Sequence, residues 1–163
     1  MTASAPAWTP LSGTRELSAD PARCDRCPQV RYLLGRLELV ARQRAKGEHP
    51  EVAPVDNLTV EHILPKGKLP PPWRKALAGD LDAHQECRNL LGNQCLLRAK
   101  TNRRLAQKPF DVKVKAFAES ELLLTRSVSK EPAWSREKIN ERQARLASLA
   151  VQAWQLPPVR NAT

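Results

Sequence analysis

The sequence predicts a mainly α-helical domain that contains a small two-stranded β element. Apolar residues recur at helical spacing along much of the chain, and proline or glycine punctuates the segments between these runs. Two short segments have the character of strands instead: residues 58–64 are partly β-branched and end at a proline, and residues 94–97 form a second short run. A length of 163 residues suits one domain with a modest core.

The N-terminal part is predicted to contain an arm, a helix and a strand. Residues 1–22 are rich in Ala, Ser, Thr and Pro and have no sustained period, which indicates a flexible arm or linker. Apolar residues at helical spacing predict a helix over 28–46, and Gly47 can end it. The strand over 58–64 follows and closes at Pro65.

The strand, a helical insertion, the second strand and a further helix make up a predicted core of about residues 57–108. The inserted helix is predicted to begin near Trp73 and to run towards Glu86, because two leucines follow the tryptophan at intervals of four. The second strand covers 94–97, and the next helix covers 99–107 and stops before a proline.

Residues 109–156 are predicted to form a helical scaffold together with the first helix, and 157–163 a C-terminal tail. One buried stripe is predicted at spacings of four and three: Phe110, Val114 and Phe117. Ser135 can cap a final helix with one broad buried face. That face comprises Ile139, Arg142, Leu146, Leu149, Ala153 and Trp154. Its charged member, Arg142, either pairs with a buried carboxylate or extends its aliphatic stem towards solvent.

The charge of the chain favours a polyanionic partner. Lys and Arg number 27 against 17 Asp and Glu, which gives a formal net charge of +10. No apolar run is long enough for a transmembrane helix, so nucleic acid is preferred over a membrane as partner. The first twenty residues lack the pattern of a signal peptide, and a cytoplasmic location is expected. The alternative reading of the charge is a basic surface that only keeps the domain soluble.

Four polar residues occupy the ends of the predicted strands and the helix that follows them: Glu61, His62, Asn93 and Asn102. A neutral imidazole such as that of His62 can take a proton from water near pH 7. Glu61 and Asn102 offer the hard oxygen ligands that Mg²⁺ prefers, and they leave coordination sites for water and a phosphate oxygen. Such an ion can stabilise charge on a phosphate and on a departing oxygen.

These residues belong to a longer pattern with which the chain resembles a known family. The chain is similar to the HNH, or ββα-metal, nuclease domain at the C-terminal end of GmrSD-type modification-dependent restriction enzymes, and to related effectors of phosphorothioate-linked DNA defence. The resemblance covers roughly residues 28–156. The matching residues are Glu61-His62-Ile63-Leu64-Pro65, Trp73, Asn89-Leu90-Leu91-Gly92-Asn93-Gln94-Cys95-Leu96-Leu97, Asn102, Lys108-Pro109-Phe110, Lys113, Trp134, Ile139, Arg142 and Trp154.

The resemblance implies a metal-dependent endonuclease, an HNH nuclease domain over 23–156, that nicks or cleaves DNA in a bacterial restriction or anti-phage system. It implies that His62 is the general base and that Asn93 braces the loop that aims it. Glu61 and Asn102 would hold Mg²⁺ or Mn²⁺. Because the chain has no glycine-rich phosphate loop, a nucleotide-hydrolysing or modification-sensing region or subunit is expected as a partner.

Several other polar residues have two readings. Four basic residues close to Asn102 in the sequence suit backbone phosphates of DNA, although a solvated helix face explains part of the cluster. They are Lys100, Arg103, Arg104 and Lys108. His84 is expected at a surface position of its helix, in preference to a place in a cleft, and His49 is expected to have no specific role.

Each site residue also has a structural reading. A Glu-His pair at a strand end is ordinary polar surface in most proteins, Asn93 after Gly92 suits a turn, and Asn102 suits a solvated helix. Their joint occurrence in the required order favours the nuclease. The alternatives are a nucleic-acid-binding module that has lost catalysis and a small zinc-stabilised interaction domain.

The alternative of a zinc-stabilised domain rests on the four cysteines. Together they could form a tetrahedral site: Cys24, Cys27, Cys87 and Cys95. The first two form a C-x-x-C pair, but the second pair is too widely spaced for a usual zinc motif. Reduced thiols without metal are therefore favoured over a structural zinc ion.

Overall fold

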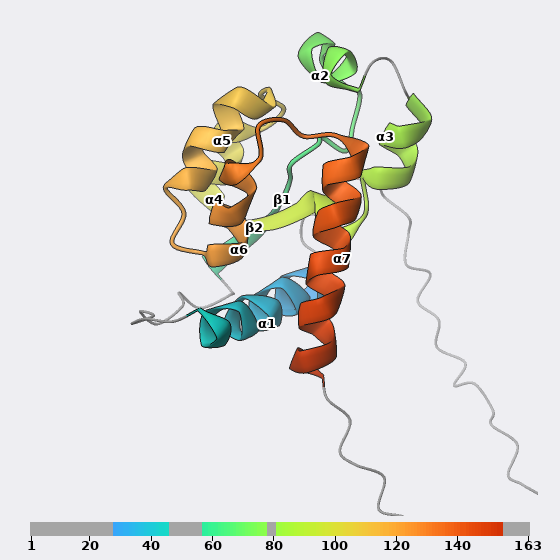
Figure 1. Ribbon diagram of the computed structural model, residues 1–163. Helices are drawn as coiled ribbons and strands as arrows, with labels where there is room; N and C mark the ends of the chain where they lie inside the picture. Colours follow the sequence, from blue (N-terminus) through green and yellow to red (C-terminus); the bar gives the residue numbers. More distant parts are fainter. Residues whose placement is uncertain (1–27, 46–56, 78–80, 155–163) are drawn as a thin grey trace, which may run out of the picture.

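The computed structural model describes residues 28–45, 57–77 and 81–154, which form helices packed around a two-stranded antiparallel sheet (Figure 1). This confirms the predicted fold class of a mainly α domain with a small β element. The predicted arm over 1–22 and the tail over 157–163 lie outside the described residues. Among the helices described, none is both long and apolar enough to cross a membrane.

The two strands lie at the predicted places, and the helix that follows them packs on the first strand. In chain order the elements are α1 (Pro28–Arg44), β1 (Leu58–His62), α2 (Pro71–Ala76), α3 (Leu81–Cys87), the 3₁₀ helix η3 (Leu91–Asn93), β2 (Gln94–Arg98), α4 (Ala99–Leu105), α5 (Phe110–Ala118), α6 (Leu123–Arg126), the 3₁₀ helix η4 (Ser127–Lys130) and α7 (Arg136–Ala153).

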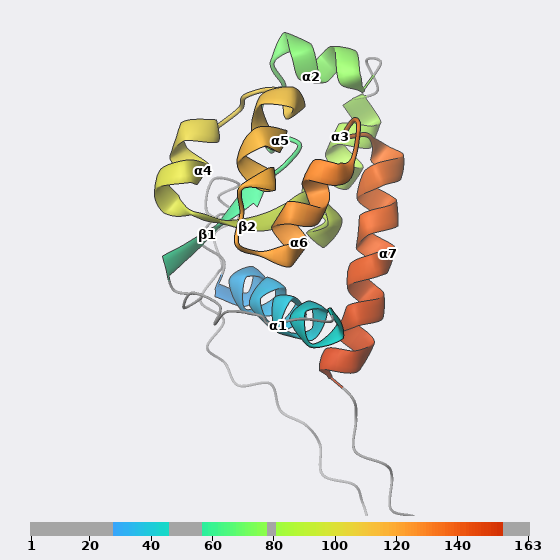
Figure 2. The ribbon, with the colours of Figure 1, turned by 60° about the vertical axis from the view of Figure 1, so that its left-hand side comes forward.

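The sheet separates two apolar clusters. β1 and β2 pair in a register that runs from Leu58 opposite Arg98 to His62 opposite Gln94. Because side chains alternate between the faces of a strand, Val60 enters one cluster, against α1 and α7, while Cys95 enters the other. Both views show α1 on one side of the sheet and α4 and α5 on the other (Figure 1, Figure 2).

The helical insertion between the strands differs from the prediction. One helix was expected from Trp73 towards Glu86, but the described residues form two: α2 ends at Ala76 and α3 begins at Leu81. Gly79, a poor helix former, lies in the sequence between them. Trp73 is nevertheless fully buried, and its indole Nε1 donates a hydrogen bond to the Lys108 carbonyl at 3.0 Å.

The C-terminal scaffold agrees with the prediction in its main helix. Ser135 caps α7, since its hydroxyl accepts a hydrogen bond from the Lys138 amide. Trp154, predicted on the buried face, is 40% exposed because the helix ends just before it. In α5 the inward stripe includes the charged Lys113, whereas Val114 is only half-buried.

Candidate functional site

Glu61 and His62 are the last two residues of β1, and both are buried, at 5% and 6% exposure. Consecutive side chains on a strand point to opposite faces, so the carboxylate and the imidazole leave β1 in different directions. Glu61 is paired with Cys95 across the sheet, and His62 with Gln94. The end of β1 therefore presents an acid on one face and a potential proton acceptor on the other.

The Glu61 carboxylate binds a lysine that comes from outside the predicted core. The Nζ of Lys113, on α5, donates to Glu61 Oε1 and also to the carbonyl oxygens of His62, at 2.9 Å, and Ile63, at 3.1 Å. Lys113 is fully buried, with its Nζ 5.9 Å from the centre of the Trp73 ring. Removing one member of such a buried ion pair typically costs about 3–5 kcal/mol, so this pair is part of the fold as well as of the site.

His62 contacts a buried glutamine on the opposite strand. Gln94 Nε2 lies 3.2 Å from His62 Nε2 and donates to the Asn89 carbonyl at 3.4 Å. The side-chain amide of Gln94 therefore orients the imidazole of His62 from the opposite strand.

Asn93 holds the backbone that follows His62. Its Oδ1 accepts hydrogen bonds from the Leu64 amide at 2.8 Å and from Trp134 Nε1 at 3.1 Å. Its Nδ2 donates to the carbonyls of Leu64, at 2.9 Å, and Arg88, at 3.1 Å, and its own carbonyl accepts from the Ile63 amide. The side-chain amide is fully buried and makes four hydrogen bonds within the protein, so these contacts suit a positioning residue.

Asn102 lies on α4 over the same face of β1 as Glu61. Its Nδ2 donates to Thr59 Oγ1 and to the Val60 carbonyl, both at 3.0 Å. Thr59 and Glu61 are two residues apart and therefore share a face of the strand. Both amide hydrogens of Asn102 are used, which leaves its carbonyl oxygen Oδ1 as the atom that can bind a further group.

The donor set fits a hard divalent cation. One carboxylate and one amide oxygen on the same face of β1 are ligands of the kind that Mg²⁺ and Mn²⁺ accept, with water and phosphate completing the coordination. Within the described residues, no three or more His, Cys, Asp or Glu side chains are grouped so that they could hold a metal ion. A metal at Glu61 would share that carboxylate with the Lys113 ammonium.

His84 corrects a prediction. It was expected at a surface position of its helix, but it is 6% exposed and its Nε2 donates to the Pro65 carbonyl at 2.8 Å. The inward face of α3 also carries Ala83 and Cys87, which places the imidazole against the segment after β1. His84 therefore ties α3 to the loop that Asn93 holds from the other side.

Arg142 supports the turn that carries Asn93 and Gln94. Its Nη1 donates to the carbonyls of Gly92, at 2.9 Å, and Gln94, at 2.8 Å, so neither predicted role, a carboxylate partner or an exposed stem, is correct. Burial lowers the pKa of Arg142 to about 10, and the guanidinium is still charged at neutral pH. A buried positive charge thereby satisfies carbonyl groups that have no strand partner there.

Gln94, Lys113 and Arg142 contact or support the site without having been assigned to it from the sequence. In the sequence, each of the three could have been noticed as a polar residue at a position where the apolar periodicity predicts a buried side chain. Arg142 was recognised as such, whereas Lys113 stands between Phe110 and Phe117 and interrupts their stripe.

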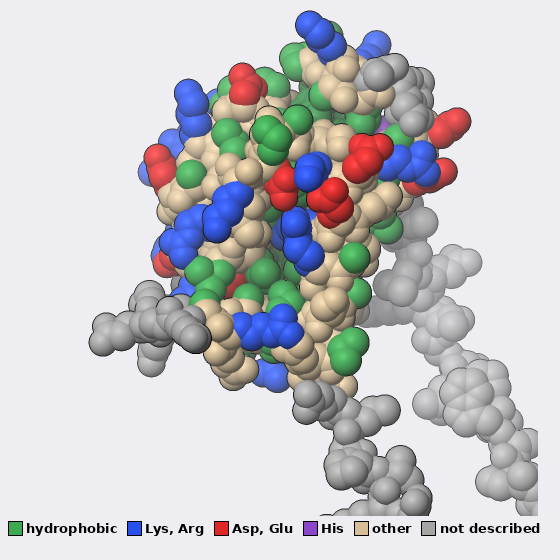
Figure 3. Space-filling view, viewed as in Figure 1, with side chains coloured by type: hydrophobic (Ala, Val, Ile, Leu, Met, Phe, Trp, Pro, Cys, Tyr) green, Lys and Arg blue, Asp and Glu red, His purple; other side chains and the backbone are tan. Residues whose placement is uncertain are grey.

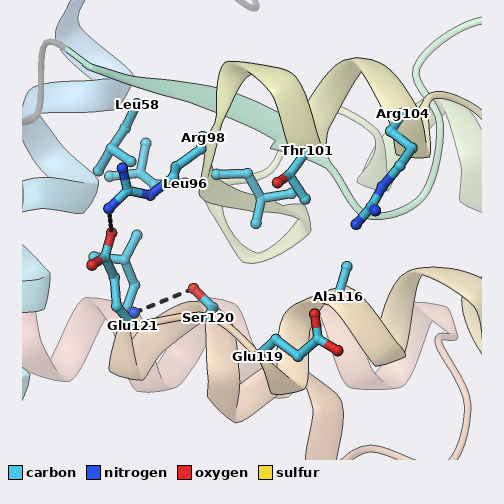
Figure 4. Close-up of a pocket in the computed structure, with 11 residues that line it drawn as sticks. Leu58, Leu96, Arg98, Thr101, Arg104, Ala116, Glu119, Ser120 and Glu121 are labelled. Atoms are coloured by element: carbon cyan, nitrogen blue, oxygen red, sulfur yellow. Dashed lines mark hydrogen bonds and ion pairs between the residues drawn. The ribbon is translucent and has the colours of Figure 1, made fainter.

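The four basic residues predicted to bind phosphate are all exposed, on α4 and just after it: Lys100, Arg103, Arg104 and Lys108. Arg104 also lines a pocket of about 210 Å³, where it and Glu119 point into the same space (Figure 4). An Arg98–Glu121 ion pair of 2.8 Å lies at this pocket. Arg98 pairs with the first residue of β1, so the pocket is at the opposite end of the sheet from His62.

The surface of α7 has a different character. In the space-filling view, basic and acidic side chains alternate near the beginning of this helix (Figure 3). Lys138 pairs there with Glu131 and Glu141, and Arg145 pairs with Glu131. These lysine and arginine side chains are balanced by carboxylates.

Cys87 and Cys95 are buried in the same apolar cluster. Burial raises the pKa of Cys95 to about 12, so its thiol is uncharged at neutral pH. Zinc binds the thiolate form, so a metal at Cys95 would require loss of this proton. The other two cysteines of the zinc alternative, Cys24 and Cys27, lie outside the described residues.

Comparison with known proteins gives one match. A family model described as "GmrSD restriction endonucleases, C-terminal domain" matches residues 15–149. A search of curated proteins and a search of solved structures gave no significant match. Every residue of the site described above lies within the matched range.

Proposed function

Because the chain belongs to the family of C-terminal domains of GmrSD restriction endonucleases, we propose that it is a metal-dependent HNH endonuclease domain that nicks or cleaves DNA. Membership of this family identifies the chain as a restriction-endonuclease domain. One observation carries the finer proposal: Glu61 and His62 are adjacent at the end of β1, and Asn102 lies over the same face of the strand as Glu61.

We assign the proton-accepting step to His62. A neutral imidazole is the form that can take a proton from an attacking water, and Gln94 orients the ring through its contact with Nε2. Asn93 acts through the backbone of Ile63 and Leu64 and fixes the chain directly after the histidine. Orientation of this kind is a substantial part of catalysis, because the acceptor must lie within hydrogen-bond reach of the water.

Glu61 and Asn102 are the residues that would hold Mg²⁺ or Mn²⁺. When bound, the ion supplies stabilisation of negative charge on the scissile phosphate and on the departing oxygen. The two side chains supply hard oxygen donors, and the contacts of Asn102 with Thr59 and Val60 fix the direction of its amide.

The DNA partner is proposed to bind through its backbone phosphates. Lys100, Arg103, Arg104 and Lys108 form an exposed basic set whose side chains suit phosphate oxygens rather than base edges. Selection of the target is assigned to a nucleotide-hydrolysing or modification-sensing region or subunit. Such an effector would act in the cytoplasm of a bacterium against foreign DNA.

The direct test is incubation of the purified chain with supercoiled plasmid, with and without Mg²⁺ or Mn²⁺. We expect nicked or linear product only when metal is present. His62→Ala should lower the rate by about 10²–10⁴-fold, the usual contribution of a general base, while DNA affinity stays nearly unchanged. Equal nicking by the parent and the His62→Ala protein would overturn the assignment.

A further inference from the structure

Lys113 is the least accessible charged group of the candidate site. It projects from α5, is 0% exposed, and uses its ammonium hydrogens on three acceptors from consecutive residues. These are Glu61 Oε1 and the carbonyls of His62 and Ile63. With no exposed surface, Lys113 cannot touch DNA, so any role in the reaction must act through the residues it contacts.

We propose that Lys113 is a positioning residue of the metal centre that orients Glu61 in advance and weakens the affinity of the site for its cation. This inference rests on the proposed function, since it requires that Glu61 is a metal ligand. It adds a residue from α5, outside the β1–β2–α4 unit, to the machinery of the site.

The orienting effect follows from the hydrogen bonds. A carboxylate with no partner can rotate, whereas Glu61 is held by Lys113 while the same ammonium holds the backbone at His62 and Ile63. The acid and the segment that carries the imidazole are therefore fixed to one common point. Loss of Lys113 should release both, which lowers the rate of the chemical step rather than the affinity for DNA.

The effect on affinity follows from charge. A divalent cation at Glu61 would lie close to an ammonium that binds the same carboxylate. Like charges repel strongly where little water screens them, and the group that repels is fully buried. A neutral side chain of similar length at position 113 should therefore let the metal bind more tightly, even though catalysis is slower.

The experiment compares Mn²⁺ binding and nicking in the parent, Lys113→Met and Lys115→Met. Lys115 is an exposed lysine of the same helix and is the matched control. Calorimetry of Mn²⁺ binding should give a dissociation constant at least about tenfold lower for Lys113→Met, because a nearby repelling charge is removed. At saturating Mn²⁺ its nicking rate should fall by about tenfold or more, and Lys115→Met should match the parent in both measurements.

A fourth protein, Glu61→Gln, distinguishes an error in the proposed metal centre from an error in the role proposed for Lys113. If Glu61→Gln binds Mn²⁺ as tightly as the parent, the proposed metal centre itself is wrong. If Glu61→Gln loses binding but Lys113→Met binds Mn²⁺ equally or more weakly, the role assigned to Lys113 is overturned while the metal centre stands. A residue with a merely structural role would not raise the affinity for metal.

Circular dichroism establishes that each variant is folded. Should Lys113→Met not fold, Lys113→Gln takes its place, because its amide is neutral and can still donate to the carbonyls. If neither single variant folds, the double variant Glu61→Gln/Lys113→Met tests the ion pair on which the proposal depends, since it leaves neither member buried without its partner. Recovery of folding in the double variant supports the pairing of Lys113 with Glu61, and failure to fold would overturn it.

Discussion

Each polar residue of the candidate site is held by a partner from another segment of the chain. Gln94 of β2 contacts His62, Lys113 of α5 contacts Glu61, and the loop after β1 is bound by Asn93. Buried polar groups need such partners, because an unsatisfied one costs about 1–3 kcal/mol. The same contacts restrict each side chain to one orientation, which is the condition for a geometry prepared in advance of the substrate.

The contact between Gln94 and His62 leads to a prediction about a single substitution. Replacement of Gln94 by alanine removes the group that orients the imidazole of His62. By analogy with histidines at metal sites, loss of an orienting partner should slow nicking by about 10–100-fold. Plasmid nicking at saturating metal and DNA measures it, and the DNA dissociation constant should not change.

The matched control is Gln85→Ala, which removes an exposed glutamine of α3. Equal rates in the Gln94 and Gln85 variants would show that His62 needs no help from β2. A fall in DNA affinity, with the rate at saturation preserved, would also contradict a role in orientation.

The primary site residues were proposed from the sequence, and their roles stay a prediction, whereas the residues that support them were not proposed. Glu61 and His62 are adjacent, and Asn93 and Asn102 follow in a fixed order, so the chemistry of the residue types was enough to group them. Gln94 lies 32 positions from His62, and Lys113 lies 52 positions from Glu61. Contacts over such distances depend on how α5 and β2 pack, which local periodicity does not encode.

At the scale of elements, α7 and η3 are joined by a close approach of backbones. A Cβ atom on Gly92 would lie 2.3 Å from the Ile139 carbonyl oxygen of α7, and the Gly92 amide donates to Gln143 Oε1 at 2.6 Å. Arg142 adds its hydrogen bonds to the same turn. The position of α7 therefore determines the position of Asn93 and of the β2 residue that contacts His62.

This packing predicts that Gly92→Ala is destabilising. The added methyl group meets backbone that cannot rotate away, so α7 or η3 must shift, and overpacking of this kind costs about 1–3 kcal/mol. Chemical denaturation followed by circular dichroism measures the loss. Gly67→Ala is the control, because its Cβ would meet only the end of the Gln107 side chain, at 3.5 Å. A Gly92 variant as stable as the Gly67 variant would show that α7 does not constrain η3.

Prediction of the elements succeeded where a pattern was continuous. Both strands, α1, α4 and the capped α7 lie where periodicity and turn residues placed them. The helix expected from Trp73 onwards failed, because leucines at intervals of four continue across a break between α2 and α3. The short α6 and η4 were not predicted, since four residues are too few to show a helical period.

For the whole molecule, the sheet lies between two apolar clusters and the candidate site lies at one end of it. Helices cover the sheet from both sides (Figure 2). The net charge of +10 provides general attraction to a polyanion. Whether particular contacts add to that attraction depends on where the basic side chains lie.

The exposed basic residues on and just after α4 lead to a prediction about DNA binding. Arg103→Ala/Arg104→Ala should weaken binding to all sequences alike and flatten the slope of log K against log salt by about 1–2 units, since each phosphate contact contributes about one. The charge-matched control is Arg126→Ala/Lys130→Ala, which removes two exposed cations from α6 and η4. Fluorescence anisotropy over a series of salt concentrations measures both. Equal slopes in the two variants would mean that net charge alone sets the affinity, and a tight complex with one sequence that survives moderate salt would mean that this chain reads bases itself.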